Sequence, residues 1–140
     1  MEAVTGPERS AVVDRVELQV PADPAYLAVL RTASAGLAAR MDLTLDEIED
    51  LRIAVDEACA LLLASRPESP EQGTGEHVLR AVFELGDDVL EVRVSGPATT
   101  LPQRSSFAWA VLEALVGEIE TGTESGQCSI LLRHRRVRRS

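Results

Sequence analysis

The sequence predicts an α+β fold: a two-layer sandwich in which helices pack on one face of a mixed, mostly antiparallel sheet. Apolar and polar residues alternate in four segments, which is typical of strands, and apolar residues recur every three or four positions in three others, which is typical of helices. These segments follow one another in the order β-α-α-β-β-α-β, without an internal repeat. The chain has 140 residues, of which 45% are hydrophobic, so it is long enough to bury one core.

The first strand and the first helix are predicted within residues 11–41. The strand covers residues 11–20 and has its apolar positions at Val12, Val16, Leu18 and Val20. Pro21 ends it, and Asp23 before Pro24 is a good N-cap for a helix with proline in its first turn. This helix extends to about Met41, with an apolar stripe formed by Leu27, Leu30, Leu37 and Met41.

The second helix is predicted to begin at Thr44, because Thr44 and Glu47 have the spacing of a capping box. Its buried face has apolar residues three or four positions apart, at Ile48, Leu51, Val55, Ala58 and Leu62. The helix pattern ends at Ser65, before Pro67. Residues 67–76 contain two prolines, two glycines and three glutamates, which indicates a loop.

The second half of the chain begins with two strands, residues 78–85 and 89–94, which form a hairpin around residues 86–88. A loop follows over residues 96–104. The third helix is predicted from Ser105 or Ser106 through Ile119, then a turn over residues 121–126 and a last strand over residues 128–132.

Charge is distributed unevenly along this single domain, which we expect over residues 11–133, with a flexible leader (residues 1–10) and a basic tail (residues 134–140). The formal net charge is −9, from 23 acidic residues against 14 arginines. Five of these arginines lie near the C-terminus: Arg133, Arg135, Arg136, Arg138 and Arg139. Residues 1–132 therefore have nine arginines against 23 acids, a charge of −14 that repels nucleic-acid phosphates. The pattern favours a solvated tail, or one that docks on an acidic partner, over a DNA-binding arm.

The sequence contains neither a membrane span nor a signal peptide: no nearly uncharged run approaches the roughly 20 residues that a bilayer requires, and residues 1–10 lack a basic and an apolar region. We therefore expect a cytoplasmic protein with no membrane partner. Cys59 and Cys128 have no metal-ligand spacing. Two reduced cysteines are favoured over a redox pair.

The element order and several motifs resemble a known family. The sequence VELQVPADPAYLAVLRTASAGLAARMDLTLDEIEDLRIAVDEAC over residues 16–59, and more weakly SSFAWAVLEALVGEIE over residues 105–120, resemble the anti-sigma factors of the histidine-kinase-like ATPase (GHKL) fold. The chain is most similar to the divergent actinobacterial branch of the serine-kinase type. The resemblance implies the GHKL sandwich, an anti-sigma function and homodimerisation through the sheet or its edge.

The resemblance also implies a partner-binding surface on the first helix. In the family, an arginine of this helix contacts both the sigma factor and the anti-anti-sigma (STAS) factor, and Arg31 in VLRT matches it. Tyr26, Ala28 and Arg40 are expected to flank the same surface. Without the resemblance, Arg31 would be interpreted as a solvated helix residue.

The nucleotide site implied by the resemblance is degenerate in this sequence. Glu57 matches the family's general base, but Leu61 replaces the asparagine that holds magnesium, a cation that prefers oxygen ligands. Residues 95–98 (SGPA) replace the Asp-x-Gly that binds adenine, and residues 103–106 (QRSS) replace the glycine-rich phosphate loop. Alone, Glu57 is more readily interpreted as an exposed helix acid next to Asp56.

We therefore expect an anti-sigma factor that sequesters an alternative sigma factor of stress or development by direct contact, is released by a STAS protein, and has no cofactor or metal. Two alternatives stay open. One is an active serine/threonine kinase of the anti-anti-sigma factor that uses ATP, Mg²⁺ and Glu57. The other is a sensor in which a different small molecule fills the vacated nucleotide cleft.

Overall fold

The computed structural model describes residues 13–65 and 77–136. The expected leader, the loop over residues 67–76 and residues 137–140 of the expected tail lie outside the described residues. Within residues 13–65 and 77–136, no helix is long and apolar enough to cross a membrane.

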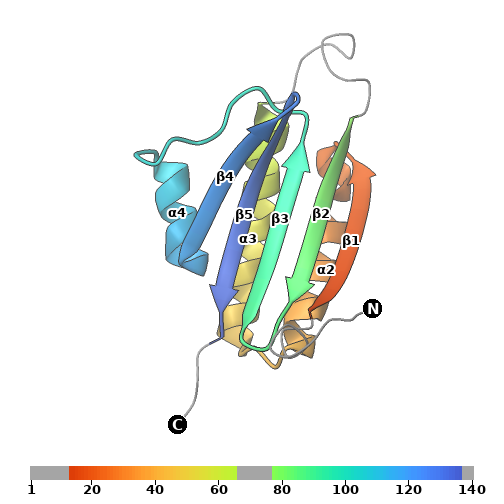
Figure 1. Cartoon of the computed structure of the whole chain (residues 1–140), viewed down its shortest axis with the longest axis vertical. Coiled ribbons are helices and arrows are strands. Elements are labelled where there is room, and N and C mark those ends of the chain that lie inside the picture. Colours follow the sequence, from red (N-terminus) through yellow and green to blue (C-terminus); the bar gives the residue numbers. More distant parts are fainter. Residues whose placement is uncertain (1–12, 66–76, 137–140) are drawn as a thin grey trace, which may run out of the picture.

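The sheet has five strands, arranged in the order β1-β2-β3-β5-β4 (Figure 1). Their bounds are β1 (Asp14–Pro21), β2 (Val78–Leu85), β3 (Val89–Gly96), β4 (Glu118–Glu124) and β5 (Gln127–Arg135). Each neighbouring pair is antiparallel, so among the described strands the sheet is fully antiparallel rather than mixed. The β2-β3 and β4-β5 hairpins account for two of these four pairs, since a short turn reverses the chain.

The strand β4 was not predicted, and the expectation of a helix through Ile119 was wrong. The helix α4 (Phe107–Val116) ends at Gly117, whose φ of 93° lies in the left-handed region that ends helices. The expected turn over residues 121–126 is mostly strand. Only Ser125 and Gly126, both with positive φ, connect β4 to β5, as in a two-residue hairpin.

The helices cover one face of the sheet (Figure 1). A 3-10 turn, η1 (Pro24–Tyr26), leads into α2 (Leu27–Arg40), and α3 (Leu45–Ala64) follows. Both predicted N-caps are present: the Asp23 carboxylate accepts from the Ala25 N–H at 2.8 Å, and Thr44 and Glu47 form the capping box. The predicted apolar stripes face the core, where Leu30, Met41, Leu51 and Val55 are buried.

The two faces of the sheet differ in chemistry. One face packs against the helices through buried residues such as Phe83, Val92 and Ile130. The other face, called the open face here, has polar and charged side chains, among them Arg15, Glu17, Arg80, Glu84, Arg93 and Arg133. The candidate sites are therefore the outer surface of the helices, the junction of α3 with the loop after β3, and the open face.

Candidate functional site

Arg31, the predicted partner-contact residue, lies on α2 and forms an ion pair with α3. Its Nη1 donates to Oδ1 of Asp56 at 2.6 Å, and the two side chains are 36% and 37% exposed. The guanidinium is thus held at the α2–α3 junction while a part of it stays accessible. No local pattern indicates this pairing, because Arg31 and Asp56 are 25 positions apart and meet only when the two helices pack.

The other predicted contact residues do not all share this surface. Ala28 is exposed and lies three positions before Arg31, so both occupy the same side of α2. Tyr26 ends the 3-10 turn before α2 and is 42% exposed. Arg40 lies nine positions after Arg31, about 13 Å along the helix, and lines a hollow with Asp14 and Asp87. The structure therefore places Arg31 with Ala28, but Arg40 at the opposite end of α2.

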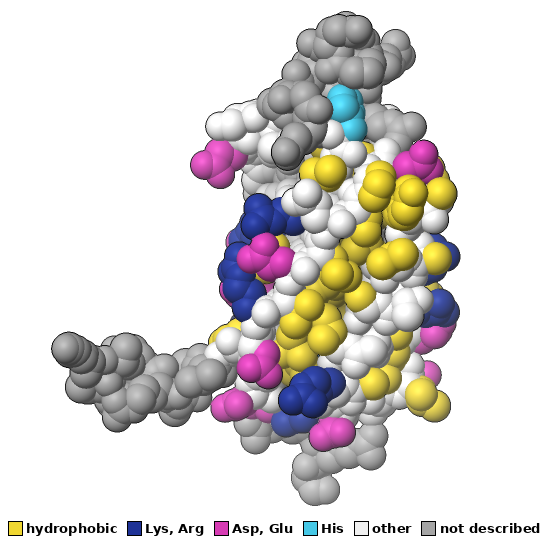
Figure 2. Space-filling model, turned by 90° about the vertical axis from the view of Figure 1, so that its right-hand side faces the viewer, with side chains coloured by type: hydrophobic (Ala, Val, Ile, Leu, Met, Phe, Trp, Pro, Cys, Tyr) yellow, Lys and Arg dark blue, Asp and Glu magenta, His cyan; other side chains and the backbone are white. Residues whose placement is uncertain are grey.

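Apolar side chains are accessible along this side of the molecule. Figure 2 shows hydrophobic groups as a band on the side where α2 and β1 lie. Two large apolar residues of η1 and α2, Tyr26 and Val29, are 42% and 46% exposed. Val29 precedes Arg31 by two positions, so it points to another side of α2. Exposed apolar groups are typical of a protein-binding surface.

Glu57, the predicted general base, is half-buried on α3 directly after Asp56. Successive residues of a helix point about 100° apart, so the two carboxylates leave α3 on different flanks. The Glu57 carboxylate has no hydrogen-bond partner within residues 13–65 and 77–136. The Glu57 carboxylate is thus able to accept a proton, but binding of a nucleotide needs ligands from other residues.

Leu61, one turn after Glu57, gives no ligand for magnesium. Its side chain is partly buried and packs against the core, as does that of Leu101 from the loop after β3. In the described residues, no group of three or more His, Cys, Asp or Glu side chains is arranged to hold a metal ion. The residues at this end of α3 therefore do not fit a magnesium-bound phosphate chain.

The loop after β3 is bonded to the end of α3, where the resemblance implies the adenine pocket. The carbonyl of Ser65 accepts from both the N–H and the Oγ1 of Thr99, each at 2.8 Å, and Ser65 Oγ donates to the carbonyl of Thr100 at 3.1 Å. Pro97 and Ala98 of the same loop are buried. These contacts join the loop to the end of α3, and no carboxylate occurs in residues 95–106 to bind an adenine amine.

The residues that replace the phosphate loop stabilise α4. Ser106 caps this helix by accepting from the Trp109 N–H at 3.1 Å, and the Arg104 guanidinium lies 5.0 Å from the centre of the Trp109 ring. A cation over an indole face is a stabilising contact. The donors of this segment that the structure describes therefore serve local structure.

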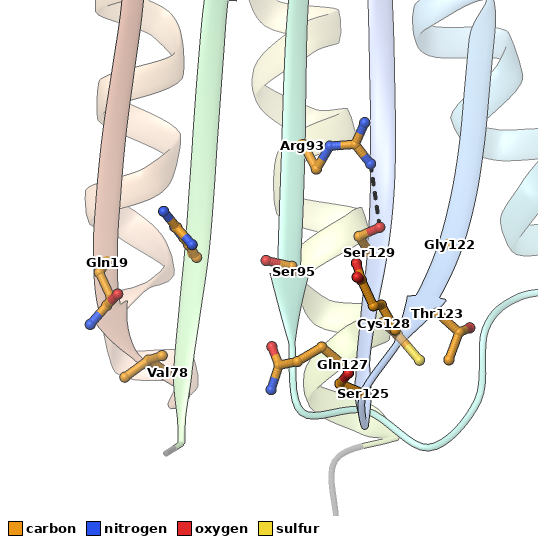
Figure 3. Close-up of a pocket in the computed structure, with 12 residues that line it drawn as sticks. Gln19, Val78, Arg93, Ser95, Gly122, Thr123, Ser125, Gln127, Cys128 and Ser129 are labelled. Atoms are coloured by element: carbon orange, nitrogen blue, oxygen red, sulfur yellow. Dashed lines mark hydrogen bonds between the residues drawn. The ribbon is translucent and has the colours of Figure 1, made fainter. Parts of the chain in front are cut away.

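Three hollows of the described residues lie elsewhere. One of them, about 750 Å³, is on the open face and is lined by residues such as Arg93, Ser95 and Ser129 (Figure 3). Neither Glu57 nor Leu61 lines any of these three. The alternative of a small molecule in the vacated cleft stays a prediction.

The two cysteines are buried and unpaired with each other. Burial, with the nearby Asp56 carboxylate as a second cause, raises the pKa of the Cys59 thiol to about 12. Cys128 donates through Sγ to the carbonyl of Ala98 at 3.2 Å. Because the thiolate is the reactive form, Cys59 has the properties of a structural residue.

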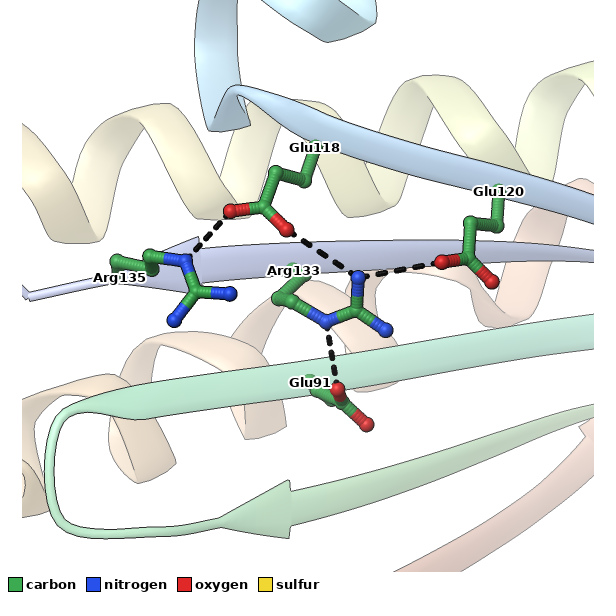
Figure 4. Close-up of polar contacts among 5 residues, drawn as sticks. All are labelled: Glu91, Glu118, Glu120, Arg133 and Arg135. Atoms are coloured by element: carbon green, nitrogen blue, oxygen red, sulfur yellow. Dashed lines mark hydrogen bonds and ion pairs between the residues drawn. The ribbon is translucent and has the colours of Figure 1, made fainter.

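Three arginines at or in the expected basic tail are bonded to the domain. The strand β5 extends to Arg135, three residues beyond the predicted end. Arg133 contacts Glu91 at 2.6 Å and both Glu118 and Glu120 at 3.2 Å, and Arg135 contacts Glu118 at 2.6 Å (Figure 4).

The third of these arginines, Arg136, donates to the carbonyl of Met41 at 2.9 Å and pairs with Asp88 at 3.2 Å. Arg133 thus lies in the domain, as expected, and Arg135 pairs with Glu118 while its side chain stays 62% exposed. Arg136, expected in the tail, is bonded to the domain. Arg138 and Arg139 lie outside the described residues.

Comparison with known proteins gives relatives over most of the chain, although no family model matches it. The chain is 34% identical over 137 residues to the serine-protein kinase RsbW of Bacillus velezensis, covering 84% of this chain and 83% of the relative. It is 31% identical over 134 residues to RsbW of Bacillus pumilus, covering 81% and 82%. With RsbW of Bacillus subtilis it shares 44% identity over 82 residues, 59% of this chain and 49% of the relative.

A similar solved structure is that of the RsbU and RsbW domains of Rv1364c from Mycobacterium tuberculosis. The match has a TM-score of 0.69 and 18% sequence identity, and it covers 91% of this chain and 34% of the other. At this identity the likeness supports the fold, and it agrees with the predicted α+β sandwich.

Proposed function

Because this chain belongs to the family of the serine-protein kinase RsbW, we propose that it is an anti-sigma factor that sequesters an alternative sigma factor by direct contact, without ATP and without kinase activity. A STAS-type anti-anti-sigma protein releases the sigma factor by competing for an overlapping face. The observation that carries the proposal is the Arg31–Asp56 pair, which leaves the guanidinium partly accessible, together with the Ser65–Thr99 bonds that join α3 to the loop after β3.

The partner face is the outer surface of α2 near its junction with α3. Arg31 supplies a partly accessible guanidinium, Ala28 leaves room for close approach, and Tyr26 adds an exposed aromatic ring at the near end. Arginine and tyrosine are the residue types most often responsible for interface affinity. Arg40 belongs to this face only if the partner extends along the whole of α2.

Loss of ATP binding is supported by three separate segments. Leu61 has no oxygen for magnesium, and the Ser65–Thr99 bonds join α3 to the loop after β3. In the segment that replaces the phosphate loop, Ser106 caps α4 and Arg104 lies over the ring of Trp109. A substitution that restores the family's residue in one of these segments leaves the other two segments unchanged.

The test is titration of the purified protein with alternative sigma factors from its own genome, followed by calorimetry with and without Mg·ATP. We expect a stable complex whose affinity does not depend on the nucleotide. Arg31→Glu should weaken it by about tenfold or more, since it places a carboxylate beside Asp56. Arg93→Glu on the open face is the matched control and should bind normally. The absence of any sigma factor complex would refute the proposal.

A second candidate, an active serine kinase of the anti-anti-sigma protein, is favoured by the names of the relatives and by the position of Glu57. Transfer of labelled phosphate from ATP to the STAS protein, abolished by Glu57→Gln, would establish it. If purified protein transfers no phosphate while it binds the sigma factor, the binding function alone holds.

A further inference from the structure

The register of the sheet places five polar or small residues in one row across the open face. Each lies directly opposite the next on the neighbouring strand: Gln19, Arg80, Ser95, Ser129 and Gly122. The members on β3, β5 and β4, which are Ser95, Ser129 and Gly122, have short side chains or none. The side chains of this row therefore project little from the sheet over these three strands.

This row of residues forms the floor of the hollow of about 750 Å³, which is lined by residues of all five strands (Figure 3). Gly122 keeps the floor open, because a Cβ at this position would come within 3.2 Å of Ser129 Oγ. Longer side chains stand around it: Arg80, Arg93, Gln127 and Glu124. The hollow thus has hydroxyls at its base, and amides, guanidinium groups and the carboxylate of Glu124 at its sides.

Arg93 differs from the other arginines of the open face in lacking a carboxylate partner among the described residues. Arg15, Arg80, Arg133 and Arg135 each form at least one ion pair. Arg93 lies opposite two apolar residues, Val82 and Leu131, and the nearby Glu91 is bonded to Arg133. Its one hydrogen bond is a long contact of 3.5 Å from Nη1 to Ser129 Oγ, directed across the hollow (Figure 3).

We propose that this hollow binds a small phosphorylated molecule, with Arg93 and Ser129 holding the phosphate and Gln19, Ser95 and Gln127 holding the polar remainder. A guanidinium with open donors and an adjacent hydroxyl match phosphate oxygens in geometry and charge. The hollow is in the size range of small-molecule sites and exceeds what a lone ion fills. Because the whole chain carries −9, phosphate does not gather on it non-specifically, and binding requires this local arrangement.

The site lies on the face opposite α2 and α3, so it is separate from the proposed sigma-factor face, although it shares the sheet through which the resemblance implies homodimerisation. It can be tested on the full chain by ¹H–¹⁵N NMR titration, first with inorganic phosphate and then with a hexose phosphate, using the unphosphorylated hexose as a neutral probe. Both phosphates should shift the amides of Ser95, Gly122 and Ser129, and the hexose phosphate should bind more tightly than phosphate alone.

The matched variants are Arg93→Gln and Arg135→Gln, which remove an arginine inside and outside the hollow. Arg93→Gln should weaken the binding of both phosphates by about tenfold, while Arg135→Gln should bind normally. Unshifted amides in excess phosphate, or equal binding by Arg93→Gln and the unchanged protein, would overturn the proposal. Equal affinity for phosphate and hexose phosphate would overturn the assignment of a larger ligand.

Discussion

Arg133 lies among three carboxylates contributed by β3 and β4 (Figure 4). Its side chain is 21% exposed, whereas that of Arg15, which pairs with Glu17 and Glu84 on the same face, is 52% exposed. A less exposed charge in several short contacts is screened less by solvent, and removing it leaves like charges close together. At the scale of single residues, the two arginines therefore differ in importance.

Arg133→Gln should lower the free energy of unfolding at neutral pH by about 1–3 kcal/mol, because Glu91, Glu118 and Glu120 lose their shared cation. Arg15→Gln, the control, should cost clearly less, because its ion pairs are solvent-exposed. Urea unfolding of the two variants measures the difference. Equal effects would show that the Arg133 network adds no more than an ordinary surface pair.

The same network predicts how stability depends on pH. Hydrogen bonds from Arg135 and Arg133 lower the pKa of Glu118 below its usual 4.5. A carboxyl whose pKa is lower in the folded than in the unfolded state contributes stability above the unfolded value, and this contribution is lost as pH falls through the folded value. Stability should therefore fall as the pH drops below 4.5, and less steeply in Arg133→Gln. Urea unfolding at several acidic pH values would show parallel profiles if this explanation were wrong.

At the scale of elements, two glycines on helices differ in conformation. Gly117 ends α4 with a φ of 93° and Gly36 lies within α2, and an added Cβ would meet no atom within 4 Å at either position. Any difference between alanine substitutions at these sites therefore comes from the backbone. The short α4, and hence the strand β4 that follows, depends on Gly117.

Gly117→Ala should destabilise the protein by about 1–2 kcal/mol, because alanine is strained at positive φ. Gly36→Ala should stabilise it by about 0.5–1 kcal/mol, since alanine favours the helix. Thermal unfolding of both variants measures the two signs. A neutral Gly117→Ala would mean that the backbone there relaxes to a helical φ.

The helix α3 provides the second element-scale prediction. Leu61→Asn restores the residue type of the magnesium position but removes a side chain that packs against the core. We expect a loss of about 1–2 kcal/mol of stability and no gain of Mg·ATP binding by calorimetry, because the loop after β3 remains bonded to Ser65. ATP binding by this variant would show that Leu61 alone had blocked the site.

At the scale of the whole molecule, charge and shape separate the two surfaces. The helices, among them α2, cover one face of the sheet (Figure 1), and the opposite, open face has the ion pairs and the hollow (Figures 3 and 4). Since the net charge is −9, the long-range field of the protein attracts a basic partner.

If the partner is a basic, DNA-binding sigma factor, the association rate should fall as ionic strength rises, by about tenfold between low and physiological salt. The dissociation rate should change less, because short-range contacts determine it. Stopped-flow or surface-based kinetics at several salt concentrations would measure both rates. A salt-independent association rate would show that the negative net charge of the protein does not steer the encounter with the sigma factor.

The sequence by itself determined the features that depend on local signals: the caps at Asp23 and Thr44, the apolar stripes of α2 and α3, and the alternation of β1, β2, β3 and β5. It also contained Arg31 and Glu57 at their matched positions, and the loss of an oxygen ligand at Leu61. Only the tertiary structure decided the rest. Ile119 alone is buried in β4, so that strand is defined by its pairing with β5. The Arg31–Asp56 pair, the Ser65–Thr99 bonds and the network of Arg133 join residues between 13 and 42 positions apart, and such contacts leave no periodic trace in a sequence because they arise when separately formed elements pack together.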